Sequence, residues 1–300
     1  MSGNQVKTDL KDNHGVEVST KLVQSVSERV GKILLQAEEE ATESSWSYSD
    51  PVEAGLVYLI GISRDGTTIP IKGENYKEAM SGTIALYDQQ RERLHTIYLG
   101  AAPEHGKAKF DARFGREIER ILQKYPGVVG IGIADGEAGN WRFLEPYIEV
   151  SILDFWHASE YLAAYARVAY QAETQRKNWL SKSCHTLKHT PKGAAKLLRE
   201  IKKYVKTHKI TEKDHPAYRA MVYFTNQKSR MNYPFYLEEN LPIGSGVVEA
   251  ACKTLVKQRF SRSGCRWTRQ SVEQVMAART LILTKGRWQQ FWEKAYKNAA

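Results

Sequence analysis

The stretch Gly55-Leu-Val-Tyr-Leu-Ile-Gly-Ile-Ser-Arg-Asp-Gly66 is an apolar run that ends in an aspartate and a glycine. It is too short for a typical helix and rich in strand-forming residues, so we predict a buried strand that ends at Asp65. A second run, Gly127-Val-Val-Gly-Ile-Gly-Ile-Ala-Asp-Gly136, has the same form and predicts another strand, ending at Asp135. Two strands that end alike would each place a carboxylate at the edge of a sheet.

The rest of the chain predicts a mixed sheet with helices against it. Further strands are expected over 67–71, 80–88, 93–99 and 148–153, and helices over 19–41, 107–125, 247–260, 270–284 and 288–298. Residues 1–17 are polar and are expected to be loose. Residues 158–240 are helix-like and basic, with breaks near Pro191, Pro216 and Pro234. This order predicts an α/β fold whose sheet is interrupted by an all-helical insertion.

Composition narrows the class of protein. The 300 residues are 42% hydrophobic and 26% charged, as in ordinary globular proteins. No apolar run approaches the ~20 residues that span a bilayer. The residues after Met1–Gln5 do not form the apolar region of a secretory signal peptide. Three cysteines, at positions 184, 252 and 265, fit a reducing compartment better than a disulfide framework. We therefore expect a cytoplasmic protein without a membrane partner.

Charge is distributed unevenly along the chain. Residues 161–300 hold 27 Lys and Arg against 9 Asp and Glu, a net charge of +18, whereas residues 1–160 carry a net charge of −8. A basic half joined to an acidic half argues for a polyanionic partner, of which nucleic acid is the first choice. A generic basic surface would explain the total charge of +10 but not its segregation.

The segment Leu241–Phe260 is expected to form a loop with two glycines and then a helix. Counting in fours from Glu249 reaches Lys253 and Lys257, so a helix places all three on one face. A carboxylate beside cations suits a site that holds a metal ion and a phosphate, although a solvated basic helix would have the same pattern. The candidates for DNA contact in this region are Lys253, Lys257, Arg259, Arg262, Arg266, Trp267 and Arg269. Trp267 could stack on a flipped base or belong to the core.

Three carboxylates form the candidate catalytic group: Asp65, Asp135 and Glu249. Asp65 and Asp135 could lie side by side if their strands are neighbours, and Glu249 could reach them from a helix beside the sheet. Carboxylate oxygens suit Mg²⁺ or Mn²⁺, and two such ions support phosphodiester chemistry. Taken singly, an Asp-Gly pair is more often a turn.

The ordered set of motifs resembles a bacterial insertion-sequence transposase of the DDE type, in the ISKra group related to mutator-like elements. The segments that carry the likeness are Arg64–Thr68, Leu86–Asp88, Arg91–Leu94, Tyr98–Lys107, Ala134–Gly136 with Asn140-Trp141, Leu153–Ala158 with Glu160–Leu162, and Gly244–Glu249 continuing to Arg262–Trp267. The resemblance implies an RNase H-like core with a helical insertion. It also implies Asp65, Asp135 and Glu249 as catalytic metal ligands for two Mg²⁺ or Mn²⁺ ions. Double-stranded DNA and further copies of the chain would be the partners, in the bacterial cytoplasm at the nucleoid.

The resemblance also implies a division of the chain into domains and a pair of residues, Asp154 and His157, that supports the site. It implies an N-terminal DNA-binding remnant over 1–50, the first part of the core over 51–157, the insertion over 158–240 and the last part of the core over 241–300. Asp154-Phe-Trp-His157 matches the family's Asp-x-x-His signature. His157 could position a DNA phosphate or hydrogen-bond Asp154 and brace the site. We favour bracing, because an Asp and a His one turn apart often pair.

Two features depart from the family pattern. Glu137 stands where the family more often has a small residue, and it adds a negative charge near the site. The region before the core is short: Gly15–Ser19 and Thr20–Gln24 could be the turn and recognition helix of a truncated helix-turn-helix, or a plain packing helix capped by Ser19.

These observations favour a metal-dependent transposase that nicks DNA at insertion-sequence ends and joins the freed 3′-hydroxyl to target DNA. The alternative is a truncated, catalytically inactive remnant that still binds DNA. A stand-alone RNase H-like nuclease is less favoured, because the helical insertion and the Arg-Trp segment have no evident use in one.

Overall fold

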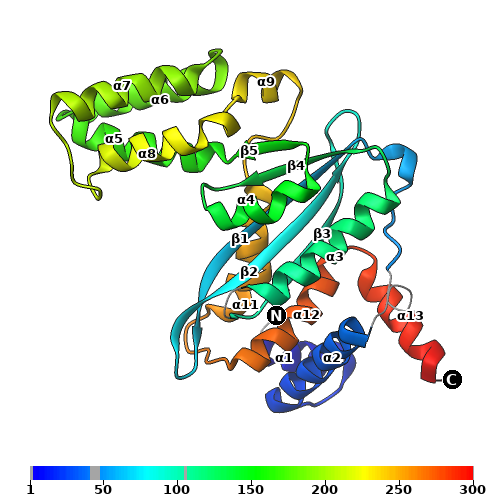
Figure 1. The fold of residues 1–300 in the computed structure, drawn as a ribbon. Coiled ribbons are helices and arrows are strands. Elements are labelled where there is room, and N and C mark those ends of the chain that lie inside the picture. Colours follow the sequence, from blue (N-terminus) through cyan, green and yellow to red (C-terminus); the bar gives the residue numbers. More distant parts are fainter. Residues whose placement is uncertain (1–2, 41–47, 105–106, 300) are drawn as a thin grey trace. The chain divides into compact units, whose positions relative to one another are not determined.

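The computed structural model describes residues 3–40, 48–104 and 107–299, so residues 105–106 of the Tyr98–Lys107 motif lie outside the described part (Figure 1). The chain divides into two compact units. Unit 1 comprises residues 1–60, 64–128 and 247–300, and unit 2 comprises residues 61–63 and 129–246. Within the described residues, none of the helices has both the length and the apolar character needed to cross a membrane.

A five-stranded mixed sheet has the strand order β3-β2-β1-β4-β5. The strands are β1 (Leu59–Ile71), β2 (Asn75–Tyr87), β3 (Arg93–Ala101), β4 (Val129–Ala134) and β5 (Val150–Leu153). β2 and β3 are antiparallel, with Thr83 opposite Tyr98, while β4 and β5 are parallel, with Ile131 opposite Val150. The predicted α/β class and mixed sheet are confirmed; the RNase H-like assignment stays a prediction.

The expectation that a strand ends at Asp65 is wrong. β1 runs through Asp65 and Gly66 to Ile71, so two predicted strands are one. Beyond Gly66 the burial alternates, with Thr67, Ile69 and Ile71 buried and the residues between them more exposed. This period of two is that of a strand with one face in the core. The burial of these side chains therefore outweighs the turn preference of Asp-Gly.

Helix α3 (Ala108–Lys124) belongs to unit 1 and packs its apolar face against strands β2 and β3. Its buried residues recur at helical spacing: Phe110, Phe114, Ile118 and Ile121. Gly82 on β2 allows the close approach, since a Cβ there would lie 2.8 Å from the Phe114 ring.

The N-terminal residues are more ordered than predicted. Residues 3–14 form α1 (Gly3–His14), where a loose segment was expected, and Asn13 hydrogen-bonds Asp9 one turn earlier at 2.8 Å. α1 packs against α2 (Thr20–Glu40), which gives this polar helix a partner. As predicted, Ser19 caps α2: its Oγ accepts a hydrogen bond from the Leu22 amide at 3.1 Å.

The C-terminal helices of unit 1 are α10 (Gly246–Ala251), the π-helical turn η4 (Cys252–Lys257), α11 (Gln258–Phe260), α12 (Arg269–Leu283) and α13 (Arg287–Ala299). Leu255 and Phe260 join Ile69 of β1 and Met276 of α12 in one apolar core. α2 packs on α12, where Gly31 touches the backbone of Gln274. The Thr20–Glu40 helix therefore has a packing role, and its alternative role as a recognition helix stays a prediction.

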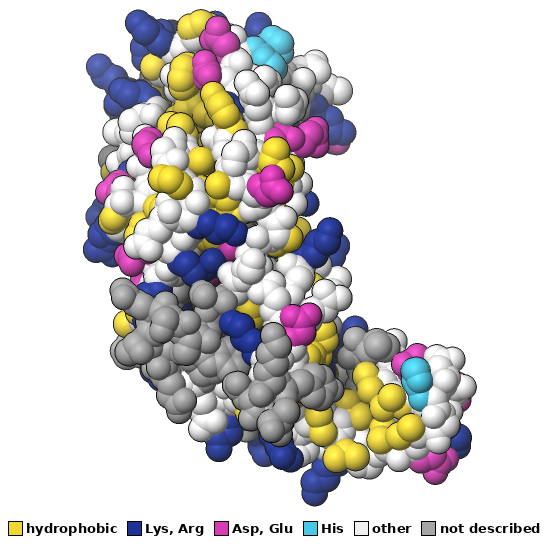
Figure 2. All heavy atoms as spheres, turned by 90° about the vertical axis from the view of Figure 1, so that its right-hand side faces the viewer, with side chains coloured by type: hydrophobic (Ala, Val, Ile, Leu, Met, Phe, Trp, Pro, Cys, Tyr) yellow, Lys and Arg dark blue, Asp and Glu magenta, His cyan; other side chains and the backbone are white. Residues whose placement is uncertain are grey.

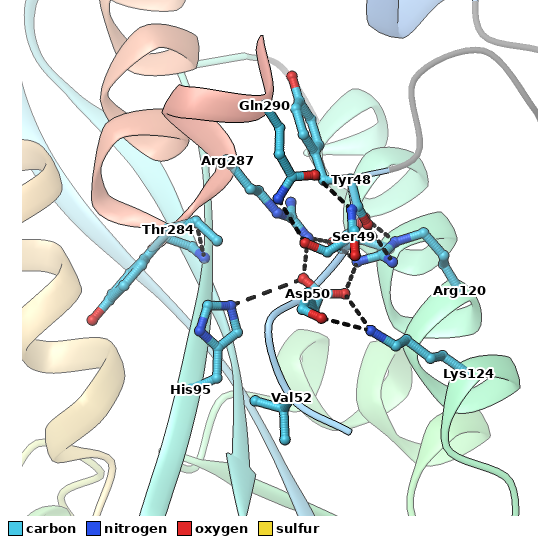
Figure 3. A network of polar contacts seen from close by, with 12 residues as sticks. Tyr48, Ser49, Asp50, Val52, His95, Arg120, Lys124, Thr284, Arg287 and Gln290 are labelled. Carbon is cyan, nitrogen blue, oxygen red and sulfur yellow. Dashed lines mark hydrogen bonds and ion pairs between the residues drawn. The ribbon is translucent and has the colours of Figure 1, made fainter. Parts of the chain in front are cut away.

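A buried polar network holds the segment before β1 in place (Figure 3). The Asp50 side chain is fully buried and accepts hydrogen bonds from Arg120 at 2.8 Å and Arg287 at 3.2 Å. Lys124 donates to the Asp50 carbonyl at 3.0 Å. Glu117 bonds both arginines. Burial opposes the charge on Asp50, but the two guanidinium groups outweigh burial and lower the pKa of this carboxyl.

Unit 2 combines β4 and β5 with a group of helices, α4 (Ala138–Leu144), α5 (Phe155–Ala169), α6 (Glu173–His189), α7 (Gly193–Thr207), α8 (Pro216–Gln227) and α9 (Tyr233–Glu238). α5 packs against α6 and α8, and α7 against α6 and α8 (Figure 1). Pro191 follows the end of α6 and Pro216 opens α8, as the sequence breaks predicted. Short 3₁₀ turns at Ala54–Leu56, Glu145–Tyr147 and Lys228–Arg230 complete the chain.

Candidate functional site

Asp65 and Glu249, far apart in the sequence, line one pocket of unit 1. The pocket has a volume of about 650 Å³, and Cys252, Lys253 and Lys257 line it too. Asp65 is half-buried on β1, whereas Glu249, Lys253 and Lys257 are exposed on the helical segment. Two carboxylates and two ammonium groups therefore face one solvent-open space.

The helix that carries Glu249 is not regular. Glu249, Lys253 and Lys257 share the pocket as counting in fours predicted, yet Cys252–Lys257 forms the wider turns of a π-helix. The half-buried Arg279 on α12 donates from its guanidinium to the carbonyls of Thr254 and Leu255 within these turns. Arg279 thus pins the lysine-bearing segment from behind, a role that the sequence pattern did not reveal.

Contacts to both carboxylate oxygens help to orient Asp65. Its Oδ1 accepts a hydrogen bond from the Gly66 amide at 2.7 Å, and its Oδ2 lies 3.5 Å from the Cys252 Sγ donor. Burial, reinforced by the charge of Asp65, raises the pKa of the Cys252 thiol to about 12. The thiol consequently stays protonated and donates to the carboxylate. Sequence reasoning gave Cys252 no part in the site.

In unit 2, Asp135 directly follows β4, as predicted. Its Oδ1 accepts hydrogen bonds from the Glu137 amide and from Asn140 Nδ2, both at 2.9 Å. Trp141 Nε1 donates to the Asp135 carbonyl at 2.8 Å. The Asn140-Trp141 pair of the sequence motif therefore fixes the position of this acid, while Glu137 is exposed beside it.

Asp154 is a buried structural acid. Its Oδ1 accepts from the amides of Trp156 and His157, which caps α5, and its Oδ2 accepts from the amide and hydroxyl of Ser245. Burial raises the pKa of this carboxyl, but the polar interaction with His157 and the hydrogen bonds from Ser245 prevail and lower it to about 2. Because both oxygens are engaged, Asp154 supports the segments around it.

His157 is a cation at neutral pH. Its Nδ1 lies 3.8 Å from Asp154 Oδ2, which is an ion-pair distance, and its side chain is 38% exposed. The polar interaction with Asp154 outweighs burial, and with help from the charge of Asp135 it raises the pKa of His157 to about 9. The Asp154–His157 pairing that we favoured is present, and the charged ring retains access to solvent.

The basic candidates fall into different surroundings. Arg262 and Arg266 are exposed, like Lys253 and Lys257. Arg269 is engaged, because its guanidinium pairs with Glu74 and donates to the Pro103 carbonyl.

Trp267 belongs to the core. It is 6% exposed and packs edge-on against Phe260, with the Arg259 guanidinium 4.6 Å from its ring centroid. Of the two alternatives for Trp267 the structure shows the core one, so stacking on a base would require this ring to leave its packing. Arg259 is correspondingly half-buried over the same ring.

The charge asymmetry of the sequence is not a property of the two units. Counted over their residues, unit 1 and unit 2 each carry a net charge of +5. On the face drawn in Figure 2, Lys and Arg side chains lie among acidic, apolar and uncharged ones. The acidic and basic halves of the chain are thus mixed by folding, and local groups of cations must carry any argument for a polyanionic partner.

The three predicted acids are distributed over both units. Asp65 and Glu249 line the pocket of unit 1, and Asp135 belongs to unit 2 with Asp154 and His157. The meeting of all three carboxylates stays a prediction. The chain matches no protein-family model and no curated protein, so these comparisons leave the family resemblance a prediction too.

Proposed function

We propose that the chain is a DDE-type DNA transposase, which cleaves phosphodiester bonds at insertion-sequence ends and transfers the freed strand to target DNA. The observation that carries the proposal is the pocket where Asp65 and Glu249 lie together with Lys253 and Lys257. Carboxylates suit a divalent cation and ammonium groups suit a DNA phosphate, so the lining fits both parts of a nucleic-acid cleavage site.

The sheet order supports the inclusion of Asp135. β1, which carries Asp65, and β4, which precedes Asp135, are neighbours in the sheet. We assign Asp65, Asp135 and Glu249 as the residues that would hold Mg²⁺ or Mn²⁺, whereas Asp154 caps α5 and binds Ser245. When bound, such ions activate a water or a 3′-hydroxyl and stabilise the leaving oxygen.

The remaining residues bind and orient DNA in this proposal. Lys253 and Lys257 contact backbone phosphates, and the cationic, half-exposed ring of His157 adds a further phosphate contact. The protonated Cys252 thiol and the Gly66 amide keep Asp65 in one orientation. The strand that is cut and the strand that is joined are both DNA, and additional copies of the chain pair the two ends.

The test uses a plasmid that carries the genomic sequences flanking the gene. We expect Mg²⁺-dependent nicking at a repeat end, and a loss of at least about a hundredfold in Asp65→Asn, Asp135→Asn and Glu249→Gln, because each change removes a negative oxygen. DNA binding measured in EDTA should stay within about twofold. The exposed Glu53→Gln is the matched control. Full cleavage by any of the three variants would refute the assignment.

Glu137 supports a second candidate, an inactive DNA-binding remnant. Its side chain is exposed next to Asp135 and adds a negative charge there. If the wild-type chain binds the flanking DNA without nicking it and Glu137→Ala restores nicking, the added charge is the cause of inactivity. If neither chain nicks, the remnant is favoured over the transposase.

A further inference from the structure

A second cavity lies wholly within unit 2 and reaches Gly136, the residue that follows Asp135. Its volume is about 330 Å³, near the lower end of the ~300–1,000 Å³ that small-molecule sites occupy. Most of its lining comes from α8, and the rest comes from Tyr161 of α5, Lys213 of the preceding turn and Gly136 after β4. The cavity therefore has room for a ligand about the size of one nucleotide.

Aromatic rings form one wall of the cavity. Tyr161 and Tyr223 stack in parallel, with centroids 3.8 Å apart and planes inclined by 12°, and Tyr218 contributes a third ring. Gly136 lets this wall reach the loop after β4, because a Cβ there would lie 2.3 Å from the Tyr223 ring. Stacking on such rings is sequence-tolerant, since every base presents a π-face.

Charged and polar groups stand beside the rings. Lys213 and Arg219 are exposed at the cavity, and within the described residues neither is part of an ion pair. The Tyr223 hydroxyl is buried without a hydrogen-bond partner in the same described residues, and burial keeps its pKa raised, so it is a neutral donor. Asn226 adds an exposed amide at the rim. This lining matches an aromatic base with a phosphate attached.

We propose that this cavity binds one unpaired nucleotide, with its base against the tyrosine wall and its phosphate on Lys213 and Arg219. The inference deepens the proposed function and rests on it for the identity of the strand as DNA. A base inside a duplex is stacked on both faces and cannot offer one to the tyrosines, so the site discriminates unpaired strands from duplexes. It would hold a single strand exposed beside the cleavage site.

The test measures binding of a short labelled oligothymidylate in EDTA, where no strand is cut, against a duplex of equal length. Val222 lines the cavity and is 38% exposed, so Val222→Glu introduces bulk and negative charge without disturbing a core. We expect single-strand affinity to fall at least about fivefold and duplex affinity to change less than about twofold. Thr225→Glu adds the same charge at an exposed position of α8 outside the cavity and should leave both affinities within about twofold.

Two further measurements guard against misfolding of the first variant. Log affinity for the single strand falls as log salt rises, and Arg219→Gln and Lys213→Gln should each make this fall less steep by about 0.7. Lys202→Gln on α7 should leave the steepness unchanged. A 2-aminopurine placed in the oligonucleotide should lose fluorescence on binding through stacking, and Tyr218→Ala should restore it. An RNA strand and free thymidine monophosphate, tested as competitors, show whether DNA, RNA or the free nucleotide is preferred.

The proposal is overturned if Val222→Glu and Thr225→Glu weaken single-strand binding equally, or if 2-aminopurine fluorescence does not respond to the wild-type protein. It fails separately from the proposed function. If the protein nicks DNA but Val222→Glu does not selectively weaken single-strand binding, only the nucleotide site is refuted. Single-strand binding that depends on Val222, in a protein that does not nick DNA, would refute only the transposase.

Discussion

Ser245 binds Asp154 twice: its backbone amide donates to Asp154 Oδ2 at 2.7 Å, and its hydroxyl donates to the same oxygen. Both residues are buried. The contact joins the segment before α5 to the segment before α10, which are separated in the chain by all the helices from α5 to α9. A neighbouring backbone bond, from Phe155 N to Ile243 O at 2.9 Å, strengthens the closure. The two ends of the helical region are thus held together at one buried carboxylate.

Removal of this carboxylate should loosen the closure and discharge His157. Asp154→Asn replaces a charged acceptor with a neutral amide, so we expect a loss of about 1.5–3 kcal/mol for the charged hydrogen bonds affected. The pKa of His157 should fall from about 9 toward its ordinary value. Urea unfolding and NMR titration of His157 measure the two effects. Ser245→Ala should lower stability but shift the His157 pKa much less, since the carboxylate remains.

Stability should depend on pH at both ends of a plateau. The folded-state pKa of Asp154 is about 2, below its ordinary 3.8, so its contribution is present above pH 3.8 and is lost as the pH falls toward 2. The pKa of His157 is about 9, above 6.5, so its contribution is present below pH 6.5 and is lost as the pH rises toward 9. The melting temperature of wild type minus that of His157→Gln should therefore shrink from pH 6.5 to 9. An unchanged difference would contradict the pairing, and the exposed His185→Gln serves as the control.

Asp50 should be the most sensitive acid of unit 1 for stability. Asp50→Ala removes one carboxylate partner from Arg287, which is 9% exposed, and one from Arg120 (Figure 3). Breaking a buried ion pair from one side costs up to about 3–5 kcal/mol, and we expect about 3 kcal/mol here because Glu117 still bonds both arginines. Denaturant unfolding measures the loss. Glu53→Ala, at an exposed position nearby, should change stability by less than about 0.5 kcal/mol.

The packing of α2 on α12 should depend on the missing side chain at Gly31. A Cβ at this position would lie 1.9 Å from the carbonyl oxygen of Gln274, and this obstacle is backbone. Gly31→Ala must therefore separate the two helices, and we expect a loss of about 1–3 kcal/mol, as for overpacked cores. Gly55→Ala, where no atom lies within 4 Å, is the matched control and should be close to neutral. Equal melting temperatures for the two variants would contradict this packing.

Strong periodic segments could be predicted from the sequence. α3, with Phe110, Phe114, Ile118 and Ile121 on one face, and β4, a short apolar run, have the expected type and nearly the expected bounds. The cap of α2 by Ser19 follows from local chemistry alone. The prediction that a strand ends at Asp65 was wrong. Local turn preference favoured an end there, but core packing of Thr67, Ile69 and Ile71 extends the strand.

The sequence by itself determined the helices and strands whose apolar period is long, the position of Asp135 after β4, and the shared face of Glu249, Lys253 and Lys257, since each follows from neighbours in the chain. Only the tertiary structure decided that Trp267 is core, that Arg269 pairs with Glu74, and that Tyr161 and Tyr223 form one wall of a cavity. The physical reason is that burial, ion pairing and cavity shape arise between segments distant in the chain, and no local pattern records which distant segment will be the neighbour.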